Sequence, residues 1–436
     1  MKKIHIIGGG TFSHVAPHLA LAAPAFGTVA REITKEWDFQ FAKEKGPVLH
    51  LTKMADYQSK LVTNEDVCKL VDELIADQDT SVIFFSAAMC DFNGSMSANS
   101  PTNLKYQPRL KTEQGRQILH LTPAEKIIKK IRKDRKDIFL VGFKTTAGDI
   151  PNEQYLQGLK LLKSASCNLV LANDIRTRLN MIITPEQARY HETTDRAEII
   201  KNLVEMTKLR SELHFTRSTI VPGNSIDWNS ELVPDSLRQV VNHCIFHGAY
   251  KPFLGSTVGH FAIKIGDNKF LTSRRKTNFN KISDSAASEW EAHKHGGLVC
   301  VETKDDDQVI AHGSRPSVGG QSQRIVFAEH PDVDCIVHAH VPKKASSNVP
   351  VRSQREFECG SHECGRNTSS GLAKFDLPNG QYLYVVMLDK HGPNIVFNKN
   401  TDPVAVIKFI DDNFYLHLRT DDVDPVYAQK FSYVQA

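Results

Sequence analysis

Long hydrophobic runs are missing from this sequence. The first apolar segment, residues 4–7, stops at Gly8, and no later run approaches the ~20 residues that a membrane-spanning helix needs. A segment this short also does not fit a signal peptide, whose apolar region is longer. We therefore expect a protein without a membrane span and with a cytoplasmic location.

A dense cysteine framework and a strong charge imbalance are missing as well. The eight cysteines are scattered, several of them inside apolar strand-like segments, which is typical of a reducing cytosol. The formal net charge is only +4 in 436 residues. This balance gives no reason to expect nucleic acid or an anionic membrane surface as a partner.

The chain is too long for one ordinary core, so we expect at least two domains. In residues 1–205, short continuous apolar runs alternate with amphipathic helical patterns such as residues 64–77 and 151–165. Continuous apolar strands between helices indicate a mainly parallel sheet that is covered on both faces. This half therefore predicts an α/β domain.

A stretch rich in Ser, Pro, Asn and Gly follows, and we expect residues 206–234 to be a linker. From residue 235 to 436 the pattern changes to alternating strands. The segment 259–273 turns at Gly-Asp-Asn like a β-hairpin. This half predicts a second α/β domain with a mixed, largely antiparallel sheet.

The first candidate site is a glycine turn at a strand end. Gly8, Gly9, Gly10 and Thr11 directly follow the apolar run at the amino end of the chain. Glycines let the backbone approach a phosphate, and the following amide groups can donate hydrogen bonds to it. A tight structural turn is the alternative interpretation.

Further segments follow this turn in a set order: "SAAMCDF", "YQPRLKT", "LVGFKTT" and "LVLANDI". Over residues 1–205 this succession resembles the phosphopantothenate–cysteine ligase family. The resemblance implies a Rossmann-like fold and a nucleotide site for CTP or ATP. The positions that match the family's site are Gly8, Gly9, Gly10, Thr11, Ala87, Ala88, Asp91, Arg109, Lys111, Phe143, Asn173 and Asp174. Two family segments are changed, to "APAFG" at 23–27 and to "ASCN" at 165–168, which removes polar groups used for substrate or nucleotide.

The second candidate site is the segment "DCIVHAHV". Side chains alternate faces along a strand, so His338 and His340 point the same way and can share a metal ion. A catalytic zinc site usually has three protein ligands, and His391, at the end of a later apolar strand and before Gly392, is the best candidate for the third.

These histidines, with "RPS" at 315–317, resemble the class II aldolase/adducin family over about residues 235–415. The resemblance implies a divalent metal, usually zinc, that supports cleavage, epimerisation or dehydration of sugar phosphates. The family's acid/base glutamate is replaced by Gly319, and His260 stands in the changed phosphate-binding segment. Arg274, Arg275 and Lys276 are candidates for binding the phosphate by charge. Candidates for replacing the glutamate are Glu356, Glu358, Glu363 and Asp389.

We therefore expect a two-domain small-molecule enzyme. The leading hypothesis is a metal-dependent lyase acting on a phosphorylated sugar-like substrate, fused to a nucleotide- or phosphate-binding domain. One alternative is a ligase-type activity in the first domain with an auxiliary metal domain. The other is a binding or scaffolding protein whose sites have decayed. Both families form oligomers, so the resemblance also implies a homo-oligomer.

Overall fold

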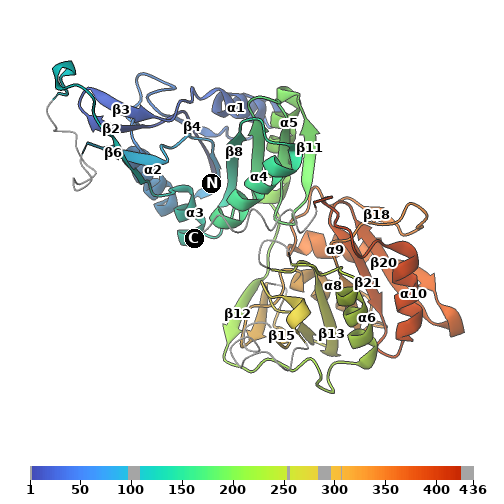
Figure 1. Ribbon diagram of the computed structural model, residues 1–436. Coiled ribbons are helices and arrows are strands. Elements are labelled where there is room, and N and C mark those ends of the chain that lie inside the picture. The colour runs from blue at the N-terminus through green and yellow to red at the C-terminus, as the bar shows by residue number, and fades with distance from the viewer. Residues whose placement is uncertain (1, 97–108, 253–255, 283–295, 306, 424–436) are drawn as a thin grey trace. The chain divides into compact units, whose positions relative to one another are not determined.

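The computed structural model describes residues 2–96, 109–252, 256–282, 296–305 and 307–423. The chain divides into two compact units (Figure 1). Unit 1 comprises residues 1–185 and 189–211, and unit 2 comprises residues 186–188 and 212–436.

Unit 1 is built on a mostly parallel sheet with the strand order β11-β10-β9-β8-β5-β1-β4. The strands β4, β1, β5, β8 and β9 run parallel, whereas β10 and β11 are antiparallel to their neighbours. The strand bounds are β1 (Lys3–Gly8), β4 (Val48–Leu51), β5 (Thr80–Phe85), β8 (Phe139–Thr146), β9 (Leu169–Asp174), β10 (Asn180–Ile183) and β11 (Arg189–Thr193). Two separate two-stranded antiparallel sheets, β2 (Phe12–Ala16) with β3 (Leu19–Ala22) and β6 (Phe92–Ser95) with β7 (His120–Pro123), stand outside this sheet.

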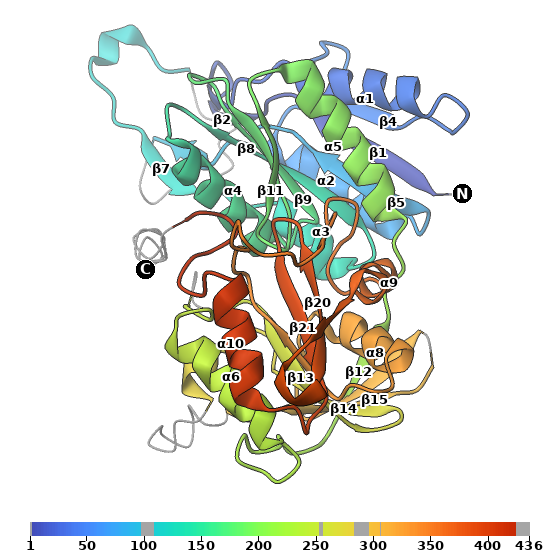
Figure 2. The same ribbon diagram turned by 90° about the vertical axis from the view of Figure 1, so that its right-hand side faces the viewer.

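Helices cover both faces of this sheet (Figures 1 and 2). The helices α1 (Thr28–Gln40) and α5 (Arg196–Ser211) pack together, and α3 (Ile128–Asp134) packs against both α2 (Asn64–Ala76) and α4 (Pro151–Ala165). Helix α2 begins at a capping box, in which the Thr63 side chain accepts from the Asp66 amide and the Asp66 carboxylate accepts from the Thr63 amide. Buried apolar faces on these helices explain why the strands between them are continuously apolar.

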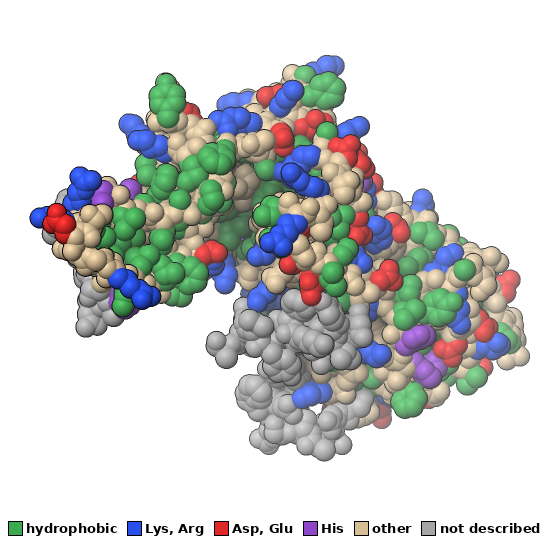
Figure 3. All heavy atoms as spheres, turned by 45° about the horizontal axis from the view of Figure 1, so that its top comes forward, with side chains coloured by type: hydrophobic (Ala, Val, Ile, Leu, Met, Phe, Trp, Pro, Cys, Tyr) green, Lys and Arg blue, Asp and Glu red, His purple; other side chains and the backbone are tan. Residues whose placement is uncertain are grey.

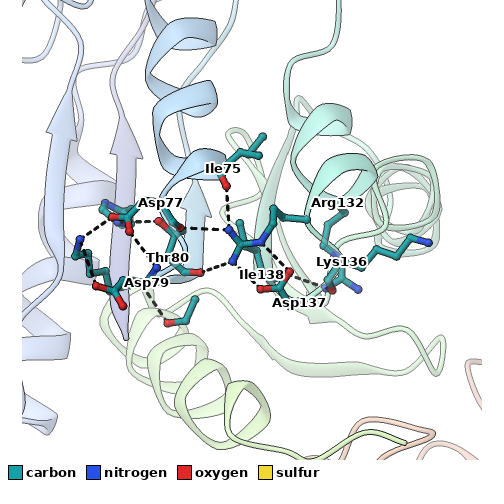
Figure 4. Close-up of polar contacts among 12 residues, drawn as sticks. Ile75, Asp77, Asp79, Thr80, Arg132, Lys136, Asp137 and Ile138 are labelled. Carbon is teal, nitrogen blue, oxygen red and sulfur yellow. Dashed lines mark hydrogen bonds and ion pairs between the residues drawn. The ribbon is translucent and has the colours of Figure 1, made fainter. Parts of the chain in front are cut away.

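A polar network joins helix and strand ends at the edge of the sheet opposite to the glycine turn (Figure 4). The Arg135 guanidinium donates to the carbonyls of Ile75 (2.9 Å), Asp77 (3.2 Å) and Thr80 (3.3 Å) and pairs with Asp137 (2.7 Å). Two of these carbonyls belong to the carboxyl end of α2, where unsatisfied carbonyls favour a cation. Arg135 therefore fixes the α2–β5 turn to the turn between α3 and β8.

Unit 2 contains a mixed sheet with the order β12-β16-β15-β14-β13-β17-β21-β20-β18, and β19 also pairs with β20. Pairing is antiparallel except for β12 with β16 and β18 with β20. The bounds are β12 (Arg217–Val221), β13 (His260–Gly266), β14 (Lys269–Thr272), β15 (Val299–Thr303), β16 (Gln308–His312), β17 (Cys335–His338), β18 (Val351–Arg352), β19 (Ala373–Asp376), β20 (Tyr382–Leu388) and β21 (Gly392–Phe397).

Each face of this second sheet has its own core. One core includes Val240 and Val241 of α6 (Asp235–Phe246) and Val406 and Ile410 of α10 (Pro403–Asn413). The other includes residues of α8 (Gly320–Glu329), which packs against α9 (His362–Gly371). Figure 2 shows these two pairs of helices on opposite sides of the strands.

The predicted fold class, a mainly parallel α/β domain followed by an α/β domain with a mixed sheet, is confirmed. The stretch 206–234, expected to be a linker, contains the end of α5 and the edge strand β12. β12 has four exposed residues in five, so it lacks the hydrophobic pattern that marks a strand. In the described part of the chain, no helix combines the length and the hydropathy that crossing a membrane requires.

Candidate functional site

The glycine turn of unit 1 begins at the carboxyl end of β1. Gly9 has a φ of +100°, and a Cβ atom there would lie 2.2 Å from Oγ1 of Thr52, so only glycine fits. Thr52 is fully buried, and its hydroxyl has no hydrogen-bond partner among the described residues. Thr52 could not be singled out from the sequence, because a lone threonine after a strand carries no functional pattern.

The backbone amides after Gly9 already donate hydrogen bonds within the fold. The Gly10 amide donates to the Ala25 carbonyl (2.7 Å), and the Thr11 amide donates to the Ala88 carbonyl (3.1 Å). The buried Thr11 hydroxyl donates to Asn64 (2.7 Å). These contacts join the turn to the loop before α1, to the segment after β5 and to the start of α2. Gly10 and Thr11 thus have a structural role, and phosphate binding by Gly8–Thr11 stays a prediction.

Asn173 and Asp174 end β9, and Phe143 lies on the neighbouring strand β8. The Asp174 carboxylate accepts hydrogen bonds from the Thr146 hydroxyl (2.8 Å) and from the amides of residues 148, 149, 176 and 177. Burial opposes ionisation of this carboxyl, but these hydrogen bonds outweigh burial and lower the pKa of Asp174. Asp174 therefore organises the loops at the carboxyl ends of β8 and β9, the edge where open α/β sheets bind ligands.

The remaining candidates of unit 1 are more exposed. Asp91 forms an ion pair with Lys126, and about two thirds of the Asp91 side chain is exposed. Arg109 and Lys111 are exposed too, and residues 106–108 of the same basic stretch lie outside the described residues. Ala87 and Ala88 follow β5, beside the glycine turn. Figure 3 shows hydrophobic side chains gathered around a hollow on the visible face of unit 1.

The structure brings His338, His340 and His391 of unit 2 together. All three are buried, and one ligand atom from each lies within 4.8 Å of the others. The ring centroid of His391 is 4.6 Å from that of His338 and 4.6 Å from that of His340. His338 ends β17, and the ring centroid of His340, two residues later, lies 5.2 Å from that of His338. His391 lies in the turn between β20 and β21. This group could hold a metal ion.

The protonation state of these imidazoles suits metal binding. Nδ1 of His338 lies 2.8 Å from the Pro393 carbonyl, which requires the proton on Nδ1 and leaves Nε2 as an acceptor. That Nε2 is buried and has no hydrogen-bond partner within the described parts of the chain. Burial lowers the pKa of His338 to about 4, and burial together with His391 and His338 lowers the pKa of His340. Neutral imidazoles are the form that binds metals.

Gly392 makes this geometry possible. Its φ is +139°, and a Cβ atom at this position would lie 2.0 Å from the Ala339 carbonyl oxygen. Only a residue without a side chain lets β21 approach the segment between His338 and His340 this closely. The dipeptide His391-Gly392 therefore holds the third histidine against the other two.

The residue that replaces the expected glutamate lies beside the same cluster. A Cβ atom at Gly319 would lie 2.3 Å from Cε1 of His260, so the His260 ring fills the space that a longer side chain would need. His260 is paired with His338 across β13 and β17, and the two ring centroids are 4.8 Å apart. Nε2 of His260 is buried without a hydrogen-bond partner among the residues described.

The basic turn after β14 runs alongside the "RPS" segment. The Ser317 amide donates to the Ser273 carbonyl (3.0 Å), and the backbones of Arg274 and Pro316 form an isolated antiparallel β-bridge. The Arg274 guanidinium donates to Ser314 (3.0 Å) and to the Gly296 carbonyl (3.1 Å), whereas Arg275 and Lys276 are exposed. Arg274 thus has structural partners, and phosphate binding by Arg274, Arg275 and Lys276 stays a prediction.

Two of the acids considered as substitutes for the glutamate have other partners. Glu363 accepts from Nδ1 of His214 (2.7 Å), and Glu356 pairs with Arg355 (3.5 Å). No described contact of Glu356 or Glu363 involves the three clustered histidines. The imidazole nearest to Gly319 is that of His260.

Comparison with known proteins finds similarity in the amino-terminal half. No family model matches the chain. Over 181 residues the chain is 24% identical to the coenzyme A biosynthesis bifunctional protein CoaBC of Thermococcus kodakarensis. The match covers 40% of this chain and 42% of that protein, so the chain spans about two fifths of the length of the curated relative it matches.

Solved structures resemble each half at low identity. The DNA/pantothenate metabolism flavoprotein of Streptococcus pneumoniae is 20% identical, with a TM-score of 0.41, covering 48% of this chain and 99% of that chain. L-fuculose 1-phosphate aldolase is 14% identical, with a TM-score of 0.28, covering 46% of this chain and 88% of that chain. Both TM-scores lie below 0.5.

Proposed function

We propose that unit 2 is a metal-dependent lyase-type catalyst for a phosphorylated, sugar-like small molecule. The observation that carries this proposal is the group of three buried histidines, each with a ligand atom within 4.8 Å of the others. Three protein ligands leave a position open for substrate, which is the pattern of catalytic rather than structural zinc sites. Zinc is therefore the proposed metal.

In this proposal His338, His340 and His391 hold the metal as neutral imidazoles, and the Pro393 carbonyl orients the His338 ring. When bound, the metal would act as a Lewis acid on a carbonyl or hydroxyl group of the substrate. The basic turn at residues 274–276 would bind the phosphate by charge. Because Gly319 offers no carboxylate, proton transfer falls to a different group than in the class II aldolases.

Unit 1 is the second candidate for an activity. Its similarity to CoaBC supports a ligase-type reaction that joins phosphopantothenate to cysteine with CTP or ATP. The buried, unpartnered hydroxyl of Thr52 beside Gly9 also favours a ligand at the glycine turn, because a buried polar group without a partner is unfavourable. We propose in addition that the chain forms a homo-oligomer, which light scattering of the purified protein would test.

The decisive experiment is elemental analysis of the purified chain and of the variant His338→Ala/His340→Ala. We expect the wild type to hold zinc and the variant to lose about one ion per chain. His330→Ala/His417→Ala, which changes two histidines outside the cluster, serves as the matched control and should keep that ion. The same metal content in the wild type and the cluster variant would contradict the proposal.

Activity assays then separate the two units. Release of a carbonyl fragment from phosphorylated sugars, lost in His338→Ala/His340→Ala, supports the lyase. Pyrophosphate release that needs phosphopantothenate, cysteine and a nucleotide, and that survives in this variant, supports the ligase-type alternative. Metal binding without either reaction would favour a binding protein and overturn both enzymatic proposals.

A further inference from the structure

A second group of metal-binding side chains lies on the strands β15 and β16. Cys300 and Glu302 are two residues apart on β15, so they share one face of the sheet. Antiparallel pairing joins Val301 to Ala311, and continuing this register sets Cys300 opposite His312. One ligand atom from each of Cys300, Glu302 and His312 lies within 4.8 Å of the others.

The distances and the donor set match a zinc-like ion. Nε2 of His312 is 3.4 Å from Oε1 of Glu302. Two ligands at about 2.0–2.2 Å from one tetrahedral ion lie roughly 3.4 Å apart, so this separation already suits a shared cation. Thiolate, carboxylate and imidazole are the three side-chain ligands that zinc takes in proteins.

The position of the His312 imidazole is a second observation that favours this site. Its Nε2 atom is buried, and the structure gives it no hydrogen-bond partner in the described ranges. This nitrogen faces Oε1 of Glu302, with which it can form an ion pair only when the imidazole is protonated. A buried polar atom without a partner is unfavourable, and a cation between the three side chains would satisfy it.

The surroundings allow an ion to enter. Cys300 is buried against Leu271 and Leu298 in the core on this face, whereas the side chains of Glu302 and His312 are 37% and 29% exposed. The group thus has an apolar base and a side open to solvent. Lys269 pairs with Glu302 (2.6 Å) and competes with a cation for this carboxylate.

We propose that Cys300, Glu302 and His312 form a second metal site, for zinc or a similar divalent cation, which cross-links β15 to β16. This site is separate from the histidine cluster, because the strands β14 and β13 lie between β15 and β17 in the sheet. It does not depend on the proposed lyase function. It differs from the histidine cluster in one decisive respect, since it contains a thiol.

Cobalt(II) added to the metal-free full chain tests this proposal. A thiolate bound to cobalt gives a charge-transfer absorption band in the near ultraviolet, and the histidine cluster has no thiolate to produce it. We expect the band in the wild type and in His338→Ala/His340→Ala, and we expect it to disappear in Cys300→Ser and to weaken strongly in His312→Ala. Cys244→Ser, which changes another buried thiol of the same core, is the matched control and should keep the band.

The cysteine pair Cys359 and Cys364 is checked in the same way, because its thiols also lie together. Cys359→Ser/Cys364→Ser should retain the band. A band that survives Cys300→Ser, or no band in the wild type, would overturn the proposal, even if the histidine cluster binds its own ion. Retention of the wild-type far-ultraviolet circular dichroism shows that each variant is folded.

Lys269→Met supplies a test that does not depend on losing a ligand. Removing the competing ammonium group should raise the affinity for cobalt at this site several-fold, because the cation no longer has to displace Lys269 from Glu302. The control is Lys264→Met, on the neighbouring strand β13. An affinity that is unchanged or lower in Lys269→Met would contradict a ligand role for Glu302.

Discussion

The imidazole of His260 occupies the space next to Gly319 in which a side chain at position 319 would lie. A Cβ atom at position 319 would lie 2.3 Å from Cε1 and 2.4 Å from Nδ1 of this ring. His260 in turn is paired across the strands with His338, a member of the histidine cluster. The loss of a carboxylate at 319 and the presence of a histidine at 260 are therefore sterically linked.

This link predicts that Gly319→Glu is tolerated only when His260 is made smaller. In the otherwise unchanged protein, the glutamate would overpack the site and lower the free energy of unfolding by about 1–3 kcal/mol. In the His260→Asn background we expect most of this cost to vanish, which corresponds to a coupling of about 1–2 kcal/mol in a double-mutant cycle. Urea unfolding of the four proteins measures it.

The neighbouring glycine provides the control for this cycle. A Cβ atom at Gly320 has no atom within 4 Å outside its own local backbone, and this residue begins α8, where an acidic side chain is favourable. Gly320→Glu should therefore leave the stability nearly unchanged. If Gly319→Glu and His260→Asn acted additively, the steric link would be refuted.

A second prediction concerns Gly392→Ala. The added methyl group would meet the Ala339 carbonyl at a positive φ, so we expect a loss of about 2–4 kcal/mol in stability and a lower metal content. Gly380→Ala is the matched control. The φ of Gly380 is +72°, but the space around it is open, so we expect only the cost of placing alanine at a positive φ, about 1 kcal/mol. Equal losses in the two variants would show that the close approach to Ala339 is unimportant.

A third prediction concerns the carboxylate of Asp174. Asp174→Asn replaces a charged acceptor of five hydrogen bonds by an amide whose NH2 group faces some of the same donors. We expect a loss of about 2–3 kcal/mol in the free energy of unfolding at pH 7. Asp149→Asn, in the same turn, changes a carboxylate that is not one of these acceptors and should cost less than about 0.5 kcal/mol. Similar stabilities of the two variants would contradict the structural role.

Much of the candidate site could be predicted from the sequence because it depends on local geometry. The common direction of His338 and His340 follows from the alternation of side chains along an extended chain, which holds although only His338 belongs to β17. His391 could be proposed because a histidine before glycine at a strand end marks a turn. Their closeness to one another is given by the structure.

The contacts that depend on strand register could not be predicted. The pairing of β13 with β17 places His260 beside His338, and the pairing of β15 with β16 brings His312 to Cys300 and Glu302. Each strand was recognisable alone, but its neighbour and register follow from the packing of the whole sheet. β12 was not recognised for a related reason. Its residues are mostly exposed, and its strand conformation comes from backbone pairing with β16 rather than from burial of side chains.

The last prediction concerns pH and the buried residue His5 of β1. Its Nδ1 lies 3.0 Å from Nε2 of His50 on β4, and Nε2 faces the Thr80 hydroxyl (3.5 Å). Burial, followed by the charge of His50, lowers the pKa of His5 from 6.5 to about 4. Of the nearby charges, Lys3 acts in the same direction, whereas Asp77 acts in the opposite one.

Between pH 6.5 and pH 4 the unfolded chain therefore binds a proton at His5 that the folded chain does not bind. The stability that depends on neutral His5 is fully present above pH 6.5 and is lost as the pH falls toward 4. We expect His5→Phe to show a smaller decrease in the free energy of unfolding between pH 7 and pH 5 than the wild type. His120→Phe, at an exposed position of β7, should keep the wild-type pH dependence. Parallel pH profiles of the wild type and His5→Phe would mean that His5 is protonated in the folded chain, and that the His5–His50 contact tolerates the charge.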